Sequence, residues 1–312
     1  MGLLHFPSSS TLAVGAGFAA LLAADSSPSG SQFAVAPILK KALALLLVLN
    51  WRSLPFAWHI QVWKTVPELY ARIWRKGEER AMAIARDPFE VSSVTKGRVT
   101  LGDGDYNMHM SNSTYARVSD AARFRFLLEL IGPAFGAGVW SPLAATAFTF
   151  YREVPLGAKY EIETRVLSWD DKWMYCISRF TTAPKRGSSE RTLCCVALFR
   201  SCFKLRGSRL SIPPARVLSY SGLAGAAGDR ANWERTQRLK RAGPRTMRRW
   251  LEYGGAAAAK RQGKWEGELP SVPEGWAPEE WQSDGLDGVE ERRLDKLVVA
   301  KRYGDTEQWK DL

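Results

Sequence analysis

The chain has 312 residues, of which 46% are hydrophobic, and it carries a formal net charge of +12. This apolar content supports a real core and excludes global disorder, and the length suits one domain with extensions or two small domains. The net positive charge favours an anionic partner, such as nucleic acid, anionic lipid or a phosphate-bearing ligand, but charge alone does not distinguish among them.

Residues 1–50 are predicted to form a hydrophobic leader with a linker. The apolar stretch TLAVGAGFAALLAA is short and no Lys or Arg precedes it, so the positive flank of a signal peptide is missing. A second apolar run, residues 33–49, is interrupted by Pro37, Lys40 and Lys41 and is marginal as a membrane span. The sequence leaves open whether the leader spans the membrane, lies on it, avoids it or is removed.

Residues 51–87 are predicted to be helical, and Pro88 ends this segment. Tryptophans stand beside basic residues here, as is typical of helices at a membrane interface. The alternative is that amphipathic helices pack on the domain that follows. We therefore expect residues 33–75 either to contact a membrane surface or to pack against the protein.

Residues 88–206 alternate between strand and helix patterns. FEVSSVTKGRVTL begins as a strand, and residues 113–131 form a helix with Asn112 or Ser113 as its N-cap and Gly132-Pro133 at its end. Helical spacing predicts one buried stripe, made of Tyr115, Val118, Ala122, Phe126 and Leu130.

Several antiparallel strands follow this helix. In KYEIETRV, apolar and charged residues alternate, so Tyr160, Ile162, Thr164 and Val166 share one face. TAFTFYREV, WMYCISRF and RTLCCVALFRSCFKL read as further strands, and SWDDKW as a turn. One long helix with an antiparallel meander predicts an α+β fold in which the sheet wraps around that helix.

The four cysteines, Cys176, Cys194, Cys195 and Cys202, lie in these strand-like runs. None forms a CxxC pair, and the three histidines are scattered, so no metal site is expected. Buried free thiols indicate a reducing compartment, which predicts an intracellular protein, cytoplasmic or membrane-associated, that is not secreted.

Residues 207–312 are predicted to form a basic, partly helical and partly disordered extension. The stretch ERTQRLKRAGPRTMRRW is strongly basic, whereas ELPSVPEGWAPEEW is acidic and proline-rich. The basic stretch is read as a solvated helix face, or as an attractor for a membrane surface or a phosphate-bearing ligand. Nucleic acid is not expected as a partner, because no binding motif accompanies the charge.

The stretch LGDGDYNMHMSNSTYARVSD, residues 101–120, carries the candidate chemistry. If the preceding strand continues, Asp103 and Asp105 point to one face. A turn at residues 107–111 then leads into the helix, whose free backbone N–H groups favour a negative charge. A carboxylate facing such groups can attack a carbonyl or activate water while the N–H groups hold the oxyanion. The alternative is that these residues only form a turn that caps the helix and take no part in catalysis.

This stretch resembles the signature D-x-D-x-x-x-H-M-N-N-x-x-Y of hotdog-fold thioesterases of the 4-hydroxybenzoyl-CoA type. The likeness is to the membrane-associated branch with thioesterase superfamily member 6 and thioesterase-like proteins of fungal secondary metabolism. It departs at Ser111, where the family usually has Asn, so an amide-specific contact there is in doubt. The likeness extends over roughly residues 88–206. The matching residues are Asp103, Asp105, His109, Met110, Asn112 and Tyr115.

The resemblance implies a hotdog domain that hydrolyses an acyl thioester, carried by coenzyme A or a carrier protein, without a cofactor. It makes Asp105 the nucleophile or base, with Asp103 supporting it or solvated. His109 to Asn112 would form the turn, contact substrate or line the oxyanion site, and Tyr115 would pack on the sheet. It also implies a homodimer. The alternative function is a non-catalytic, membrane-associated acyl-binding or scaffolding protein. The sequence does not identify the acyl group.

Overall fold

The computed structural model describes residues 35–184, 189–208, 210–226 and 228–304. The chain divides after Trp51 into two units, which are described separately. In the first unit, helix α2 (Val35–Leu49) is apolar and exposes most of its leucines. The rest of the predicted leader lies outside the described residues. Within the described ranges, no helix has the length and apolar character needed to cross a bilayer.

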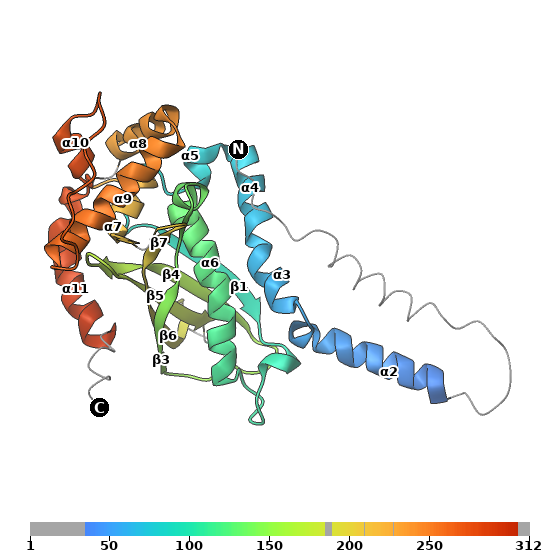
Figure 1. The fold of residues 1–312 in the computed structure, drawn as a ribbon. Coiled ribbons are helices and arrows are strands. Elements are labelled where there is room, and N and C mark those ends of the chain that lie inside the picture. Colours follow the sequence, from blue (N-terminus) through green and yellow to red (C-terminus); the bar gives the residue numbers. More distant parts are fainter. Residues whose placement is uncertain (1–34, 185–188, 209, 227, 305–312) are drawn as a thin grey trace, which may run out of the picture. The chain divides into compact units, whose positions relative to one another are not determined.

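The second unit is built on a five-stranded antiparallel sheet in the order β1-β4-β5-β6-β3 (Figure 1). The predicted alternation along β4 is confirmed, because residues 160, 162, 164 and 166 are all buried. The strands are β1 (Ser92–Arg98), β3 (Leu143–Phe150), β4 (Lys159–Trp169), β5 (Met174–Thr182) and β6 (Thr192–Ser201).

Helix α6 (Asn112–Gly136) packs on one face of this sheet (Figure 1). All five residues of the predicted stripe are buried, which confirms the face that the helix turns to the sheet. The N-cap is Ser111, one residue earlier than predicted. The predicted end is also wrong: the backbone kinks at Ile131, and helix resumes to Gly136 because Pro133 is tolerated in a first helical turn.

The segment before β1 forms short helices, of which α3 and α4 lie against α6 (Figure 1). Trp58 donates a hydrogen bond to Asp120 on α6, with 3.1 Å between the indole nitrogen and the carboxylate oxygen. This contact ties the N-terminal helices to the sheet domain. The elements are η1 (Trp51–Ser53), α3 (Ala57–Trp63), α4 (Thr65–Lys76) and α5 (Glu78–Ala81).

A small sheet in the order β2-β7-β8 adjoins the C-terminal extension, which contributes β8 and a set of helices. Helix α11 covers the sheet face opposite α6, where Leu297 and Ala300 pack on Tyr175 of β5 (Figure 1). The elements of the extension are β8 (Ser211–Ile212), α7 (Pro214–Tyr220), α8 (Ala231–Ala242), α9 (Pro244–Arg261), α10 (Pro278–Gln282), η3 (Asp287–Val289) and α11 (Glu290–Gly304); earlier in the chain lie η2 (Leu101–Asp103), β2 (Val139–Trp140) and β7 (Phe203–Leu205).

In its described part, this extension is more regular than its composition suggests. Trp250 and Trp281 have no exposed surface and belong to the same core as Phe126 of α6. The Arg216 guanidinium is buried over the Trp250 ring, 3.5 Å from its centroid, and lies 3.0 Å from an oxygen of Asp284. A buried cation needs such partners, and here they join α7, α9 and the chain after α10.

Many of the basic residues between 235 and 249 have partners inside the protein. Arg238 lies 2.8 Å from Glu280, Arg248 lies 2.9 Å from Glu252, and Arg235 is buried. These contacts favour a structural role for much of this charge.

The four cysteines are free and buried, as predicted. Burial raises the pKa of the Cys195 thiol to about 12, and it also raises the pKa of Cys176. Both thiols therefore stay protonated at neutral pH and act as core residues.

Candidate active site

Asp103 lies at the centre of a buried ion cluster. Its side chain has no exposed surface, and one carboxylate oxygen lies 2.9 Å from Nη1 of Arg52. The same oxygen accepts hydrogen bonds from the backbone N–H and the hydroxyl of Thr100, at 2.8 and 2.7 Å. Its other oxygen pairs with Arg117 of α6. The Asp103 side chain is therefore buried with partners on both oxygens, and it is not solvated.

The prediction that the two aspartates share a strand face is wrong. Strand β1 ends at Arg98, and Thr100 and Asp103 form a capping box around the 3-10 turn η2. This turn sends the Asp103 side chain into the protein, while the Asp105 side chain keeps 24% of its surface exposed.

Asp105 begins a tight turn that leads back toward α6. Its backbone N–H donates to the carbonyl of His109 at 3.0 Å, and its carboxylate accepts from the N–H of Asn107 at 2.9 Å. Met108 has a positive φ of 61°, which lets the chain reverse within five residues. The turn holds a partly exposed carboxylate close to the N-terminus of α6.

His109 stands between two carboxylates. Its Nδ1 lies 3.3 Å from Asp105 and its Nε2 lies 3.5 Å from Glu153, a residue in the loop that follows β3. The ring can therefore donate to one carboxylate through each nitrogen when it is protonated. This arrangement links Asp105 to the segment at the end of β3.

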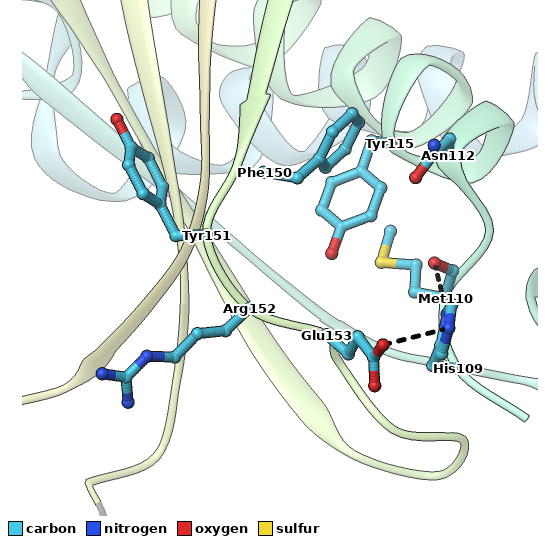
Figure 2. Close-up of a pocket in the computed structure, with 8 residues that line it drawn as sticks. All are labelled: His109, Met110, Asn112, Tyr115, Phe150, Tyr151, Arg152 and Glu153. Carbon is cyan, nitrogen blue, oxygen red and sulfur yellow. Dashed lines mark hydrogen bonds and ion pairs between the residues drawn. The ribbon is translucent and has the colours of Figure 1, made fainter. Parts of the chain in front are cut away.

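A pocket of about 240 Å³ opens beside His109 (Figure 2). The Tyr115 hydroxyl and the Glu153 carboxylate point toward its centre, whereas Tyr151 and Arg152 extend away from it. The pocket lies between the start of α6 and the end of β3, so it joins the turn to the sheet edge. Its lining residues are His109, Met110, Asn112, Tyr115, Phe150, Tyr151, Arg152 and Glu153.

The first turn of α6 provides backbone donors next to this pocket. The N–H of Ser111 donates to the Asp103 carbonyl at 2.9 Å, and the N–H of Thr114 donates to Ser111 at 2.9 Å. Within the described part of the chain, the N–H groups of Asn112 and Ser113 have no such carbonyl acceptor. These are the groups that the helix dipole makes attractive to an anion.

Tyr115 both packs in the core and borders the pocket. Its ring meets Phe150 and Phe180 with centroids 5.0 Å away in each case. Burial, with smaller contributions from Cys195 and Cys194, raises the pKa of the Tyr115 hydroxyl. The hydroxyl therefore stays protonated and can donate a hydrogen bond into the pocket.

The structure thus brings four of the predicted residues, His109, Met110, Asn112 and Tyr115, into one pocket. Asp105 is in contact with this pocket through His109, and Asp103 lies behind it. Glu153 was missed, because it is 44 residues after His109 and no local spacing rule connects them. Among the described residues, no group of His, Cys, Asp or Glu side chains is arranged to hold a metal ion.

Comparison with known proteins places this site in a family. A model described as the thioesterase-like superfamily matches residues 99–224. That segment belongs to the thioesterase-like superfamily. The sheet wrapped around α6 is its hotdog fold, which confirms the predicted fold class.

Curated relatives extend the likeness beyond this segment. The chain is 26% identical over 219 residues to Thioesterase lcsJ of Purpureocillium lilacinum, covering 58% of this chain and 70% of that protein. It is 27% identical over 196 residues to Probable thioesterase YBR096W of Saccharomyces cerevisiae, covering 61% and 82%. It is 36% identical over 105 residues to Protein THEM6 of Danio rerio, covering 32% and 51%.

The buried cluster predicts a stability effect at Asp103. Asp103→Asn removes the charge that compensates Arg52 and Arg117, and we expect the free energy of unfolding to fall by about 3 kcal/mol, as for other broken buried ion pairs. Urea unfolding measures this as a lower midpoint with an unchanged slope.

The matched control is Asp105→Asn, which changes the same chemical group two residues away. Because the Asp105 side chain is partly exposed and has no guanidinium partner in the described part of the chain, its substitution should cost no more than about 1 kcal/mol. Equal losses for both variants would contradict the structural role of Asp103.

Proposed function

We propose that this chain hydrolyses an acyl thioester, borne by coenzyme A or a carrier protein, with Asp105 as the reacting carboxylate. One observation carries the proposal: a partly exposed carboxylate is held in a turn directly before α6, 3.3 Å from a histidine that opens into the pocket. The family supports the reaction class, since its model and several relatives are thioesterases by name.

The reaction needs a group that delivers oxygen to the thioester carbon. Asp105 either attacks this carbon itself, to form an anhydride that water then cleaves, or takes a proton from the attacking water. In both routes the C–S bond breaks, the thiol leaves with a proton, and the acyl group departs as a carboxylic acid. The N–H groups of Asn112 and Ser113 are proposed to hold the oxyanion that forms on the carbonyl oxygen.

His109 is proposed to orient the Asp105 carboxylate. With one ring nitrogen facing Asp105 and the other facing Glu153, it restricts the rotation of the carboxylate that must meet the substrate. The protonated Tyr115 hydroxyl supplies a further donor for the acyl part of the substrate.

The alternative is a non-catalytic acyl-binding or scaffolding protein with the same fold and pocket. Burial favours catalysis over this alternative, because Asp105 remains accessible while Asp103, two residues earlier, is fully buried. A binding protein would keep its affinity for an acyl thioester when Asp105 loses its charge, and it would show no turnover.

The reaction is tested with Asp105→Asn. This change keeps the size of the side chain and removes its basicity, so kcat should fall by roughly two to four orders of magnitude. A panel of acyl-CoA thioesters of different chain length, followed by release of the free thiol, measures it.

The matched control is Glu153→Gln, which alters the other carboxylate beside His109. We expect kcat to change by about tenfold or less in this variant, since its carboxylate is three-quarters exposed. If Glu153→Gln is the inactive variant and Asp105→Asn is active, Glu153 is the base. If wild type turns over no thioester, the scaffolding alternative is favoured.

We also propose that the chain forms a homodimer through β3. The two edges of the sheet differ: β1 carries Lys96 and Arg98 beside the exposed Val94, whereas β3 exposes Leu143 and Phe150 and has no charged residue. Charged residues protect an edge strand from pairing, and an exposed apolar edge favours it. A second copy of β3 would continue the sheet, and the pocket at the end of β3 would lie near that copy.

A lysine in the middle of β3 tests the dimer. Ala147→Lys places like charges near each other across two antiparallel copies, so the protein should sediment as one chain of 34.8 kDa rather than as two. Ala71→Lys on α4 adds the same charge elsewhere and should leave the dimer intact. A monomeric wild type in sedimentation velocity would contradict the proposal.

We further propose that the N-terminal helices contact a membrane surface. In the second unit, Tyr70 and Trp74 lie one turn apart on α4 with 62% and 87% of their surfaces exposed, and the basic Lys76 follows them. In the first unit, α2 exposes apolar side chains such as Leu46. Aromatic and basic side chains together suit the interface with anionic lipid.

Flotation with vesicles of phosphatidylcholine and phosphatidylserine tests this contact. Wild type should float with the vesicles, and the double variant Leu46→Ser, Trp74→Ser should lose about tenfold or more in partitioning. Val298→Ser, which removes an exposed apolar side chain from α11, is the control and should float like wild type. If wild type stays in the soluble fraction, the helices do not bind this surface.

A further inference from the structure

We infer that Arg52 is a positioning residue for the catalytic turn. It comes from the segment before α3, outside the residues 99–224 that match the family, and it holds the turn through the buried Asp103. This inference rests on the proposed function in so far as it concerns catalysis. The geometric part, that Arg52 orders the turn, stands independently of the substrate.

Arg52 contacts the site through a buried ion pair. Its side chain is largely buried, with 14% of its surface exposed, and its Nη1 lies 2.9 Å from a carboxylate oxygen of Asp103. Burial raises the pKa of Tyr160, a residue of β4, and the nearby Arg52 partly offsets this shift. A partly exposed surface arginine would contribute little, but one that neutralises a fully buried carboxylate is hard to replace.

The fit between Tyr160 and β1 supports this role. Gly97 is paired with Tyr160 across the two strands, and a Cβ at Gly97 would come within 2.3 Å of the Tyr160 ring. The absence of a side chain at position 97 therefore leaves room for the Tyr160 ring beside β1. Because Arg52 lies near Tyr160 as well as Asp103, its position is linked to β4 as well as to the turn.

The backbone of Asp103 connects its buried side chain to the turn and to the start of α6. Its carbonyl accepts from the N–H of Ser111 at 2.9 Å and from the Thr114 hydroxyl at 3.0 Å, both at the start of α6. The next residue, Gly104, forms an antiparallel bridge with Met110. Asp105 and His109 are then the ends of the turn beyond this bridge, and their separation depends on where Asp103 is held.

Arg52 is therefore expected to affect the geometry of the turn as well as the stability of the fold. Loss of its guanidinium leaves the oxygen of Asp103 that it contacts with two hydrogen bonds from Thr100 but without its cationic partner, so the turn can shift relative to the N–H groups of α6 without global unfolding. A displacement of about 1 Å at a reacting group can lower a rate by about 100-fold. Phe150 and Tyr115, which line the pocket and are proposed to bind the acyl group, are not part of the Arg52–Asp103 ion pair, so affinity for the acyl group should be kept.

The test compares Arg52→Gln, Arg52→Lys and Arg75→Gln in the full-length protein. Arg75 is an exposed arginine on α4 and serves as the matched control. Hydrogen exchange by mass spectrometry reports on the amides of residues 103–111, and kcat and KM are measured at a temperature where thermal melts show every variant to be folded.

In Arg52→Gln, exchange at residues 103–111 should be faster than in wild type. Its kcat should fall by about 10- to 100-fold with KM changed by less than about threefold. Arg52→Lys keeps the charge and should recover most of kcat, and Arg75→Gln should match wild type in every measurement. Combining Arg52→Gln with Asp103→Asn should cost less than the product of the two single effects, because one residue acts through the other.

The outcomes separate the two proposals. If Asp105→Asn is inactive but Arg52→Gln has the kcat of the control, the positioning role is overturned, whatever the exchange shows. If no thioester is turned over by wild type, the proposed function fails, and the exchange at residues 103–111 alone decides whether Arg52 orders the turn. Exchange equal to that of Arg75→Gln overturns it in that case.

Discussion

The buried carboxylate of Asp103 is the interaction on which the geometry of the site depends. A carboxylate without exposed surface is unfavourable unless charges and hydrogen bonds compensate for its lost hydration. Here the compensation comes from Arg52 before α3, Thr100 before η2 and Arg117 on α6. Three segments far apart in the chain are thereby fixed around one group, and the exposed turn that follows has a defined starting point.

Two aspartates separated by one glycine therefore have opposite environments. Both carboxylate oxygens of Asp103 have hydrogen-bond donors as partners, and the side chain has no exposed surface with which to contact a substrate. Asp105 accepts from one backbone N–H and faces His109, so part of its carboxylate remains accessible. The buried group fixes the start of the turn, and the accessible group is the one proposed to react. One carboxylate could not both anchor the turn and act as a strong base, because the hydrogen bonds that hold a carboxylate in place also lower its basicity.

The sequence predicts those parts of the fold that follow from a repeating period. The alternation of Tyr160 to Val166 and the stripe from Tyr115 to Leu130 are both found, because burial of one face follows directly from the geometry of a strand or a helix. The shared face of Asp103 and Asp105 is wrong because the Thr100 capping box overrides the strand period. Arg52 and Glu153 have no local signal at all, since their roles arise only when distant segments meet.

The surroundings of the sheet explain why its β3 edge matters to the site. Helix α6 covers one face and α11 the other, and the β1 edge carries Lys96 and Arg98. Among the described elements, β3 is left as the apolar edge, and the residues that follow it, Phe150 to Glu153, form one wall of the pocket. In the proposed dimer, assembly and catalysis would therefore use the same short segment. A strand added at β3 would restrict the wall that faces His109, and the proposed role of Arg52 is to restrict the turn, so both constraints on the pocket would originate outside the motif itself.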